Sequence, residues 1–403
     1  MNLFRALHYR PFALLWTGQT ISRVGDGLYR IALAWWVLEK TGSATAMGTV
    51  LIFTSVPMLL FLLVGGVVVD RLPRARVMLV SDFALGIIVA VVSVLAYTNL
   101  LEIWHIYVAG IVFGLAEAFF RPAYTAIVPD VTPREALTSA NSLTALSQEV
   151  AGIGGPAIGA AIVAAGGTSL AFALDAVSFL ISVGCLIGIS ALIPADDGPR
   201  ESTSVVRDVR EGIGVVRASP WLWITITMAA FANITLAGPF SVTTPFLIKE
   251  HLHADVGSLG LVYSVFSFGS VAAAVWLGSR LHVRKRGLLT YSVWLLSSMA
   301  LAVIGVMPSV LGVAIAAFIC GVGLSIGNLI WINTLQEMVP PKLLGRVSSI
   351  DSLGSFVFTP IGYGISGWAT DLIGPASVFI LGGILTGIFN ILGMLHPAVR
   401  DLD

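Results

Sequence analysis

The sequence predicts an all-α integral membrane protein with twelve transmembrane helices. Apolar stretches long enough to cross a bilayer follow one another from Pro11 to His396, with short charged loops between them. A spanning helix needs about 20 mostly apolar residues. The composition agrees, because 57% of the residues are hydrophobic and only 11% are charged, against roughly 25% in a soluble domain. No alternating pattern of barrel strands is present, so helices are the predicted spanning elements.

The distribution of basic residues predicts the orientation of these spans. With a cytoplasmic N-terminus, only Lys40 and Lys249 fall outside, whereas Arg23, Arg30 and Arg121 fall within spans and the other lysines and arginines lie inside. The positive-inside rule therefore predicts a multi-pass protein of the cell membrane with both termini cytoplasmic. The first apolar run is too long for a cleavable signal peptide. The predicted spans are 12–38, 44–69, 78–98, 103–127, 139–165, 170–193, 220–247, 257–279, 287–307, 310–337, 347–370 and 376–396.

The longest polar stretch divides the chain into two halves that resemble each other. Val128 and Pro129 of the first half recur as Val339 and Pro340 at the equivalent place in the second. An internal duplication is therefore expected, with two pseudo-symmetric six-helix bundles and a substrate site between them near the membrane midplane. The predicted domains are an N-terminal bundle at 1-193, a cytoplasmic linker at 194-219 and a C-terminal bundle at 220-403.

A loop motif after the second span predicts a conformational latch. It consists of Gly66, Asp70, Arg71 and Arg74. Gly66 is expected to permit close helix contact, and Asp70 to pair with Arg74 or to face the positive N-terminus of another helix. Such a contact can hold one conformation and break in another. The alternative is a plain basic loop on the cytoplasmic side.

This loop resembles the motif between the second and third helices of the major facilitator superfamily, which implies the major facilitator fold. In the fifth span, Gly155, Pro156 and Gly159 resemble a Gly-Pro motif of that superfamily's antiporters, which implies export. Ordinary packing of small residues is the alternative. The stretches 22–27, 121–123, 140–143 and 174–179 are similar to strings in its drug, macrolide and enterobactin exporters. The resemblance extends over essentially the whole chain.

Ionisable groups inside the predicted spans are candidates for coupling transport to an ion gradient. Such groups are costly at membrane depth and are functional candidates by default. The coupling candidates are Asp26, Glu117 and Glu149. The alternative is that these acids only neutralise neighbours and fix helix packing. Their expected charge partners are Arg23, Arg30 and Arg121, and two further acids, Asp82 and Asp175, are expected to serve structural roles near span ends.

The second half keeps polar rather than charged residues in its spans. The predicted substrate cavity includes Gln148 from the first half and Asn233, Asn328 and Asn333 from the second. Trp276, Trp331 and Phe240 are candidates for apolar lining, the alternative being that they face lipid or the protein core.

The sequence contains no motif that indicates an enzyme. It lacks a phosphate-binding loop, a metal-ligand spacing within the spans and a nucleophile-base constellation. No cofactor, metal or nucleic acid is expected, and Cys185 and Cys320 are predicted to be free buried thiols. The predicted function is secondary active export of amphipathic small molecules such as drugs, macrolides or siderophores. The protein is expected to act as a monomer and to use an ion gradient, with H⁺ favoured over Na⁺ as the coupling ion. The alternatives are an importer or lipid transporter of the same fold, and a membrane sensor or assembly partner that transports nothing.

Overall fold

The structure is a computed structural model that describes residues 3–192, 205–278 and 285–402. The side chains of residues 63, 70, 205–209 and 342 also lie outside the description. All regular secondary structure in the described residues is helical, as the sequence predicts. The chain separates into two compact units, the first formed by Met1–Gly42 and Val50–Glu201, and the second by Ser43–Thr49 and Ser202–Asp403.

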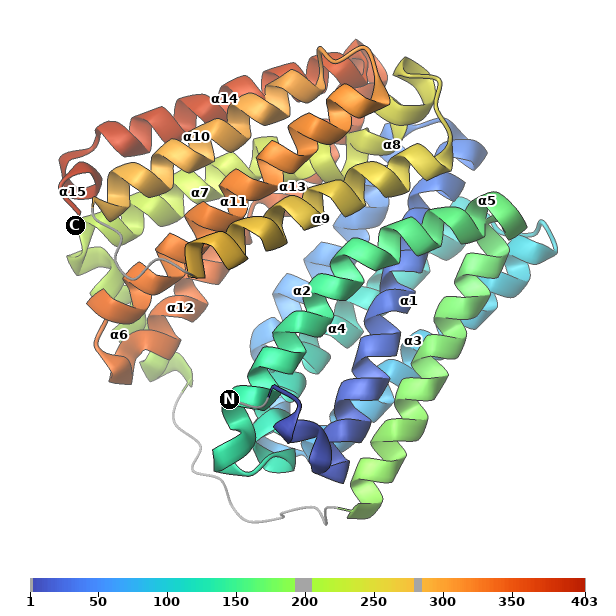
Figure 1. Ribbon diagram of the computed structural model, residues 1–403, viewed down its shortest axis with the longest axis horizontal. Coiled ribbons are helices and arrows are strands. Elements are labelled where there is room, and N and C mark those ends of the chain that lie inside the picture. Colours follow the sequence, from blue (N-terminus) through green and yellow to red (C-terminus); the bar gives the residue numbers. More distant parts are fainter. Residues whose placement is uncertain (1–2, 193–204, 279–284, 403) are drawn as a thin grey trace. The chain divides into compact units, whose positions relative to one another are not determined.

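The first unit contains five long helices (Figure 1). The fifth is drawn as two arms that meet at a sharp bend, because Gly167 has a non-helical backbone with φ of 77° inside it. Only glycine adopts this region without steric cost. The two arms correspond to the predicted fifth and sixth spans. The helices are α1 (Arg10–Thr41), α2 (Ala44–Arg71), α3 (Arg74–Tyr97), α4 (Ile103–Val131) and α5 (Leu137–Leu192), after the short η1 (Arg5–His8).

Close backbone contact joins α1 to α5. A Cβ atom on Gly27 would lie 2.7 Å from Cα of Gly155, and one on Gly159 would lie 2.9 Å from Cα of Leu28. Only glycine fits at these points, so the predicted Gly-Pro motif is part of a close helix interface of this unit. Within a membrane, small residues at an interface allow van der Waals contact that larger side chains prevent.

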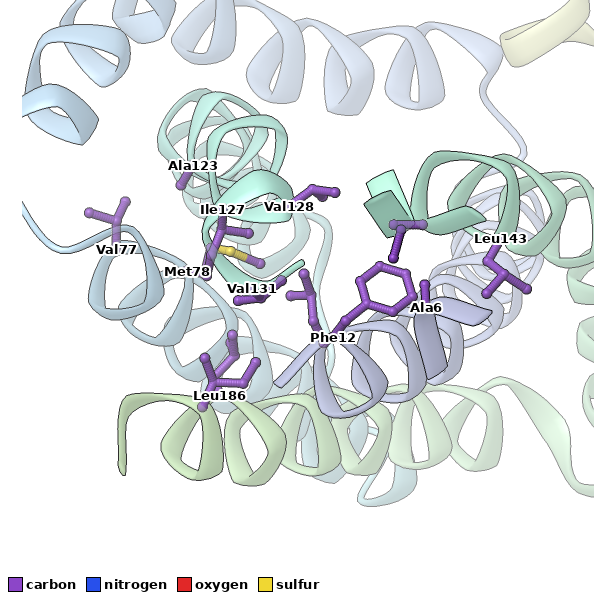
Figure 2. Close-up of a cluster of buried hydrophobic side chains, with 14 of the residues drawn as sticks. Ala6, Phe12, Val77, Met78, Ala123, Ile127, Val128, Val131, Leu143 and Leu186 are labelled. Carbon is purple, nitrogen blue, oxygen red and sulfur yellow. The ribbon is translucent and has the colours of Figure 1, made fainter. Parts of the chain in front are cut away.

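A cluster of buried apolar side chains fills one end of the first unit (Figure 2). Phe12 from α1, Met78 from α3, Ile127 from α4 and Leu143 and Leu186 from the two arms of α5 all belong to it. Each is no more than 3% exposed. Four helices are therefore fixed to one another at this end by interdigitating side chains.

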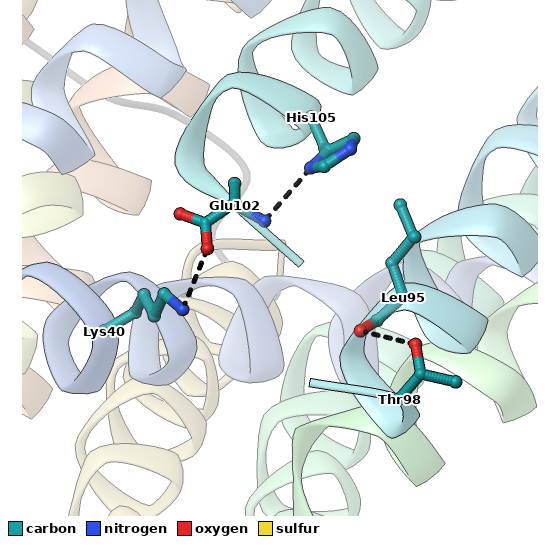
Figure 3. A network of polar contacts seen from close by, with 5 residues as sticks. All are labelled: Lys40, Leu95, Thr98, Glu102 and His105. Atoms are coloured by element: carbon teal, nitrogen blue, oxygen red, sulfur yellow. Dashed lines mark hydrogen bonds and ion pairs between the residues drawn. The ribbon is translucent and has the colours of Figure 1, made fainter. Parts of the chain in front are cut away.

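A short polar connection links α3 to α4 (Figure 3). Glu102 precedes α4 and accepts from its third backbone N–H, while Nδ1 of His105 accepts from the backbone N–H of Glu102. This is a capping box, which satisfies two donors that the helix start leaves free. Lys40 at the end of α1 forms an ion pair with Glu102 at 3.2 Å, so the same acid ties α1 to the start of α4.

The second unit contains the remaining helices, several of them interrupted. The element after the linker is α6 (Val205–Ala218), a helix within the stretch predicted as linker. The seventh predicted span begins as α7 and continues through two wider π-helical segments, and the eleventh is broken between α12 and α13. The elements are α7 (Pro220–Gly238), η3 (Pro239–Thr243), α8 (Thr244–Phe246), η4 (Leu247–His251), α9 (Val256–Gly278), α10 (Arg286–Ile304), α11 (Val310–Met338), α12 (Pro341–Phe356), α13 (Thr359–Ile373), α14 (Pro375–Leu395) and α15 (Pro397–Arg400).

The two units share a packing motif. In the second unit a Cβ atom on Gly362 of α13 would lie 2.8 Å from Cα of Ile234 on α7, which repeats the close contact of α5 with α1. The helices concerned hold equivalent places in the two halves. This likeness supports the predicted duplication, and the precise domain boundaries stay a prediction.

The first residues of α2 belong to the second unit, as part of Ser43–Thr49. The carboxylate of Asp371, at the end of α13, accepts from the backbone N–H groups of Ala44 at 2.7 Å and Thr45 at 3.0 Å, and from the hydroxyl of Ser43 at 2.8 Å. Asp371 thus caps a helix that is distant in sequence. Burial raises its pKa, but these hydrogen bonds together outweigh that effect, and the pKa falls below its usual value.

Nine helices in the described part of the chain are long and apolar enough to cross a membrane. This set counts the two arms of α5 once, and it omits both α1 and the divided pair α12 and α13. The helix positions agree with the predicted spans, while the total of twelve crossings stays a prediction. Cys185 and Cys320 are free, as predicted, although Cys185 is only partly buried.

Candidate functional site

Arg23 of α1, an expected charge partner of Asp26, contacts both α4 and α5. The guanidinium of Arg23 lies over the ring of Tyr124, 4.9 Å from its centre. With the amide oxygen of Gln148 turned toward it, Arg23 donates to that oxygen at 2.6 Å from Nη1 and 3.2 Å from Nη2. Gln148, predicted as part of a substrate cavity, is therefore held by the arginine that stands one turn from Asp26.

The other predicted coupling acids differ in their surroundings. Glu117 pairs with Arg121 at 3.5 Å, the i,i+4 pair that the sequence predicts. Its charge also acts on Asp26, which in addition faces Arg23 and Arg30. Glu149 is exposed and forms no ion pair with any residue that the structure describes. Asp26 is therefore the predicted acid on which opposing charges converge.

Asp82 belongs to a buried hydrogen-bonded network that sequence reasoning missed. Its side chain is 2% exposed. Its Oδ2 accepts from the hydroxyl of Ser182 at 2.6 Å and from Nε2 of Gln19 at 3.2 Å, and Gln19 also donates to Ser182 at 2.8 Å. The acid thus lies near the start of α3 and is enclosed by α1, α3 and the second arm of α5.

Asp175 is a second buried acid that the sequence placed at a span end. It is 0% exposed. A Cβ atom on Gly25 would lie only 2.4 Å from Oδ1 of Asp175. The hydroxyl of Ser178 donates to Asp175 Oδ1 at 3.2 Å, while Oδ2 has no hydrogen-bond partner among the described residues. The charges of Asp175 and Asp26 act on each other. The signal for this contact was Gly25, the small residue next to Asp26.

One contact of the predicted latch differs from expectation, and its Asp70–Arg74 pair stays a prediction. Arg74 pairs with Asp130 of α4 at 2.6 Å and donates to the carbonyl of Ala126. The side chain of Asp70, its predicted partner, lies outside the described residues. The expected close contact at Gly66 is also wrong, because no described atom lies within 4 Å of a Cβ placed there, whereas one on Gly65 would meet the carbonyl of Ala118. Arg71 is exposed.

The second unit contains a cavity of about 360 Å³. Asn233, Asn328, Phe240 and Trp331, all predicted to line a cavity, lie in its wall, whereas Asn333 is exposed and does not. Asp351, which lies near the start of the predicted eleventh span, also lines the cavity. The complete lining is Thr225, Met228, Ala229, Ala232, Asn233, Leu236, Ala237, Phe240, Ser241, Phe266, Tyr291, Trp294, Leu301, Cys320, Leu324, Asn328, Trp331, Asp351, Ser355, Phe356, Thr386 and Asn390.

Two of the interruptions in the helices of the second unit, η3 and the break after α12, border this cavity. Phe240 and Ser241 come from the π-helical η3, and Ser355 and Phe356 end α12. Where α12 stops, the carbonyl of Ser355 accepts from Nδ2 of Asn233 at 2.9 Å. Irregular backbone at membrane depth is tolerated where protein groups or a cavity satisfy it, so the amide of Asn233 stabilises the break. In the described residues no cluster of His, Cys, Asp and Glu has the arrangement of a metal site.

Comparison with known sequences gives one family and a consistent group of relatives. The family model for the Major Facilitator Superfamily matches residues 15–362. Macrolide efflux protein A of Streptococcus pyogenes is 24% identical over 396 residues, which is 97% of each protein. Enterobactin exporter EntS of Shigella dysenteriae is 26% identical over 400 residues, which is 98% of this chain and 94% of the exporter.

Solved structures share the fold at low sequence identity. The nucleoside transporter NupG superposes with a TM-score of 0.73 and 12% identity over 98% of each chain. A bacterial homologue of the iron transporter ferroportin, in an inward-facing state, superposes with a TM-score of 0.74 and 15% identity over 96% of this chain and 99% of the other.

Proposed function

Because this chain belongs to the major facilitator superfamily and is a multi-pass membrane transporter rather than an enzyme, we propose that it is a proton-coupled exporter of amphipathic small molecules in the bacterial cell membrane. Two of the relatives that it matches over nearly its whole length are named as exporters, of macrolides and of enterobactin. It would work by alternating access, with two bundles moving about a site near the midplane.

The observation that carries the coupling proposal is the set of acids inside the first unit. Asp82 and Asp175 are almost completely buried, and Asp175 acts electrostatically on Asp26 of α1. Carboxylates that repel one another at low dielectric do not all ionise at once. Uptake of a proton by one member therefore changes the forces between α1, α3 and α5 and biases one conformation over the other.

Asp26 has the central place in this proposal. The charges of Glu117 and Asp82 and those of Arg23 and Arg30 act on it in opposite directions, so we propose that its protonation changes how far the arginines are neutralised. Glu117 and Glu149 remain coupling candidates, and Asp82 and Asp175 join them. A proton that enters along the membrane potential releases roughly 2.3 kcal/mol per 100 mV, which exceeds the about 1.4 kcal/mol needed for a tenfold substrate gradient.

The test is transport by everted membrane vesicles with radioactive erythromycin, a macrolide, followed by a panel of lipophilic dyes. We expect respiration to drive erythromycin into the vesicles, and a protonophore to abolish this accumulation. Asp26→Asn should reduce uphill accumulation at least about tenfold, because an amide cannot bind and release a proton in the transport cycle. Downhill exchange of substrate should remain. Asp401→Asn, at an exposed acid near the C-terminus, is the matched control and should change neither.

Other outcomes separate the alternatives. Protonophore-insensitive accumulation that follows a sodium gradient would replace H⁺ by Na⁺ as the coupling ion. Accumulation in right-side-out vesicles would indicate an importer. Absence of flux for every compound, from folded protein, would contradict the proposed function.

A further inference from the structure

The cavity of the second unit carries a single charge, and that charge is negative. Asp351 is the one acid in its lining, and the lining contains no lysine, arginine or histidine. Nε1 of Trp331 donates to Oδ2 of Asp351 at 3.2 Å. No ion pair joins Asp351 to a basic residue in the described part of the chain. A neutral indole N–H stabilises the carboxylate but leaves its charge uncompensated.

Six aromatic side chains contribute to the wall of the cavity. Phe240 and Phe266 have ring centres 4.4 Å apart, and Tyr291 and Trp294 have ring centres 5.4 Å apart. Trp331 adds an indole beside the carboxylate. The electron-rich faces of such rings attract cations, with tryptophan the strongest of them.

The polar groups of the wall complete the same preference. The amides of Asn328 and Asn390 lie in the lining, and each offers an oxygen that accepts hydrogen bonds from an ammonium group. An anion would meet the carboxylate and the negative ring faces without a cationic residue to hold it. A hydrophobic cation meets complementary charge and apolar surface together.

We infer that this cavity binds an amphipathic cation, with its positive centre against Asp351 and Trp331 and its hydrophobic body between the aromatic rings. The inference rests on the proposed export function for its biological meaning, since it names the substrate class of that exporter as lipophilic amines and related cations. The binding itself requires no gradient and no transport.

Equilibrium binding to the purified full chain in lipid nanodiscs tests the charge preference. The probes are tetraphenylphosphonium, tetraphenylborate and triphenylphosphine oxide, which carry similar aromatic bodies with positive, negative and zero charge. The readouts are calorimetry and quenching of tryptophan fluorescence. We expect the phosphonium to bind at least about tenfold more tightly than the borate, a difference of about 1.4 kcal/mol. Equal affinities, or a preference for the borate, would overturn the inference.

Substitutions then locate the charge. Asp351→Asn should lower phosphonium affinity about tenfold and leave the oxide within about threefold, whereas Asp351→Glu should retain phosphonium binding because it keeps the carboxylate. Asp401→Asn is the control for an acid outside the cavity. If Asp351→Asn does not fold, Trp331→Phe replaces it and should weaken quenching by the phosphonium. Unchanged phosphonium affinity in the folded Asp351 variant would contradict this site.

Failure of the proposed function gives a different pattern of results. Phosphonium binding that depends on Asp351, without any energised flux, would leave the cation site standing and contradict the exporter. Energised erythromycin efflux that is unaffected by Asp351→Asn, together with charge-independent probe binding, would keep the exporter and reject the cation site.

Discussion

Substitution of Gly27 by alanine should separate α1 from α5 and destabilise the first unit. The added Cβ would lie 2.7 Å from Cα of Gly155 and 2.9 Å from its carbonyl carbon, against about 3.5–4.0 Å for carbon atoms at optimal separation. Both neighbours are backbone atoms, so no side chain can rotate away. The helices must move apart by about 1 Å, a gap that forfeits roughly a quarter to a half of the dispersion energy of each contact it opens.

The expected cost is about 1–3 kcal/mol, the usual range for overpacking. The matched control is Gly154→Ala on the partner helix α5, where the nearest atom to the new Cβ is a side-chain carbon 3.9 Å away. Alanine is favoured over glycine within a helix by roughly 0.5–1 kcal/mol, so the control should be neutral or slightly stabilising. Both substitutions add one carbon atom. Gly27→Ala is expected to lower the free energy of unfolding, and Gly154→Ala to leave it unchanged or raise it slightly.

The assay is thermal unfolding of both variants in the same detergent, followed by tryptophan fluorescence. Gly27→Ala should lower the apparent Tm by at least about 3 °C, and Gly154→Ala should leave it unchanged or raise it. If the two variants unfold at the same temperature, the interface is more compliant than the backbone distances indicate and the reasoning fails.

Four further substitutions test three individual contacts by the same unfolding assay. Ser182→Ala removes the shorter hydrogen bond to buried Asp82 and should cost about 1–3 kcal/mol; an unchanged Tm would mean that this acid is already satisfied by other groups. Arg74→Ala should cost more than Asp130→Ala, because Arg74 also donates to an α4 carbonyl, and equal losses would show that only the ion pair matters. Asp255→Ala removes the cap of α9 and should cost about 1 kcal/mol at neutral pH. Hydrogen bonds from the backbone and hydroxyl of Ser258 lower the pKa of Asp255 below 3.8, so its contribution is full above that pH and disappears as the pH falls through the lower folded value. A difference between variant and parent that persists at pH 2 would contradict this assignment.

Hydropathy and local spacing predicted the features that depend on one helix at a time. The spans follow from runs of apolar residues, and the Glu117–Arg121 pair follows from the i,i+4 geometry of a single helix. The break at Gly167 between the arms of α5 also coincides with the boundary between two predicted spans. None of these inferences needed the position of a neighbouring helix.

Contacts between helices were predicted less well, because a position along a span does not determine which face is covered. Asp175 is near a span end and yet fully buried, since Gly25 on another helix leaves room for its carboxylate. Arg74 pairs with Asp130 of α4, which is distant in sequence. Asp351 lines the cavity because the end of α12 approaches Trp331 of α11, which residue spacing alone does not reveal.

The break between α12 and α13 limits how mutation can reshape the cavity. Part of the polar wall there is main chain, and Pro360 has no N–H with which to occupy the Phe356 carbonyl. Any residue placed at Ser355 still supplies the carbonyl that Asn233 holds. Variants with an altered range of ligands should therefore differ at aromatic positions such as Phe240 and keep the break. The backbone acceptors at the break stay in place whatever side chains surround them.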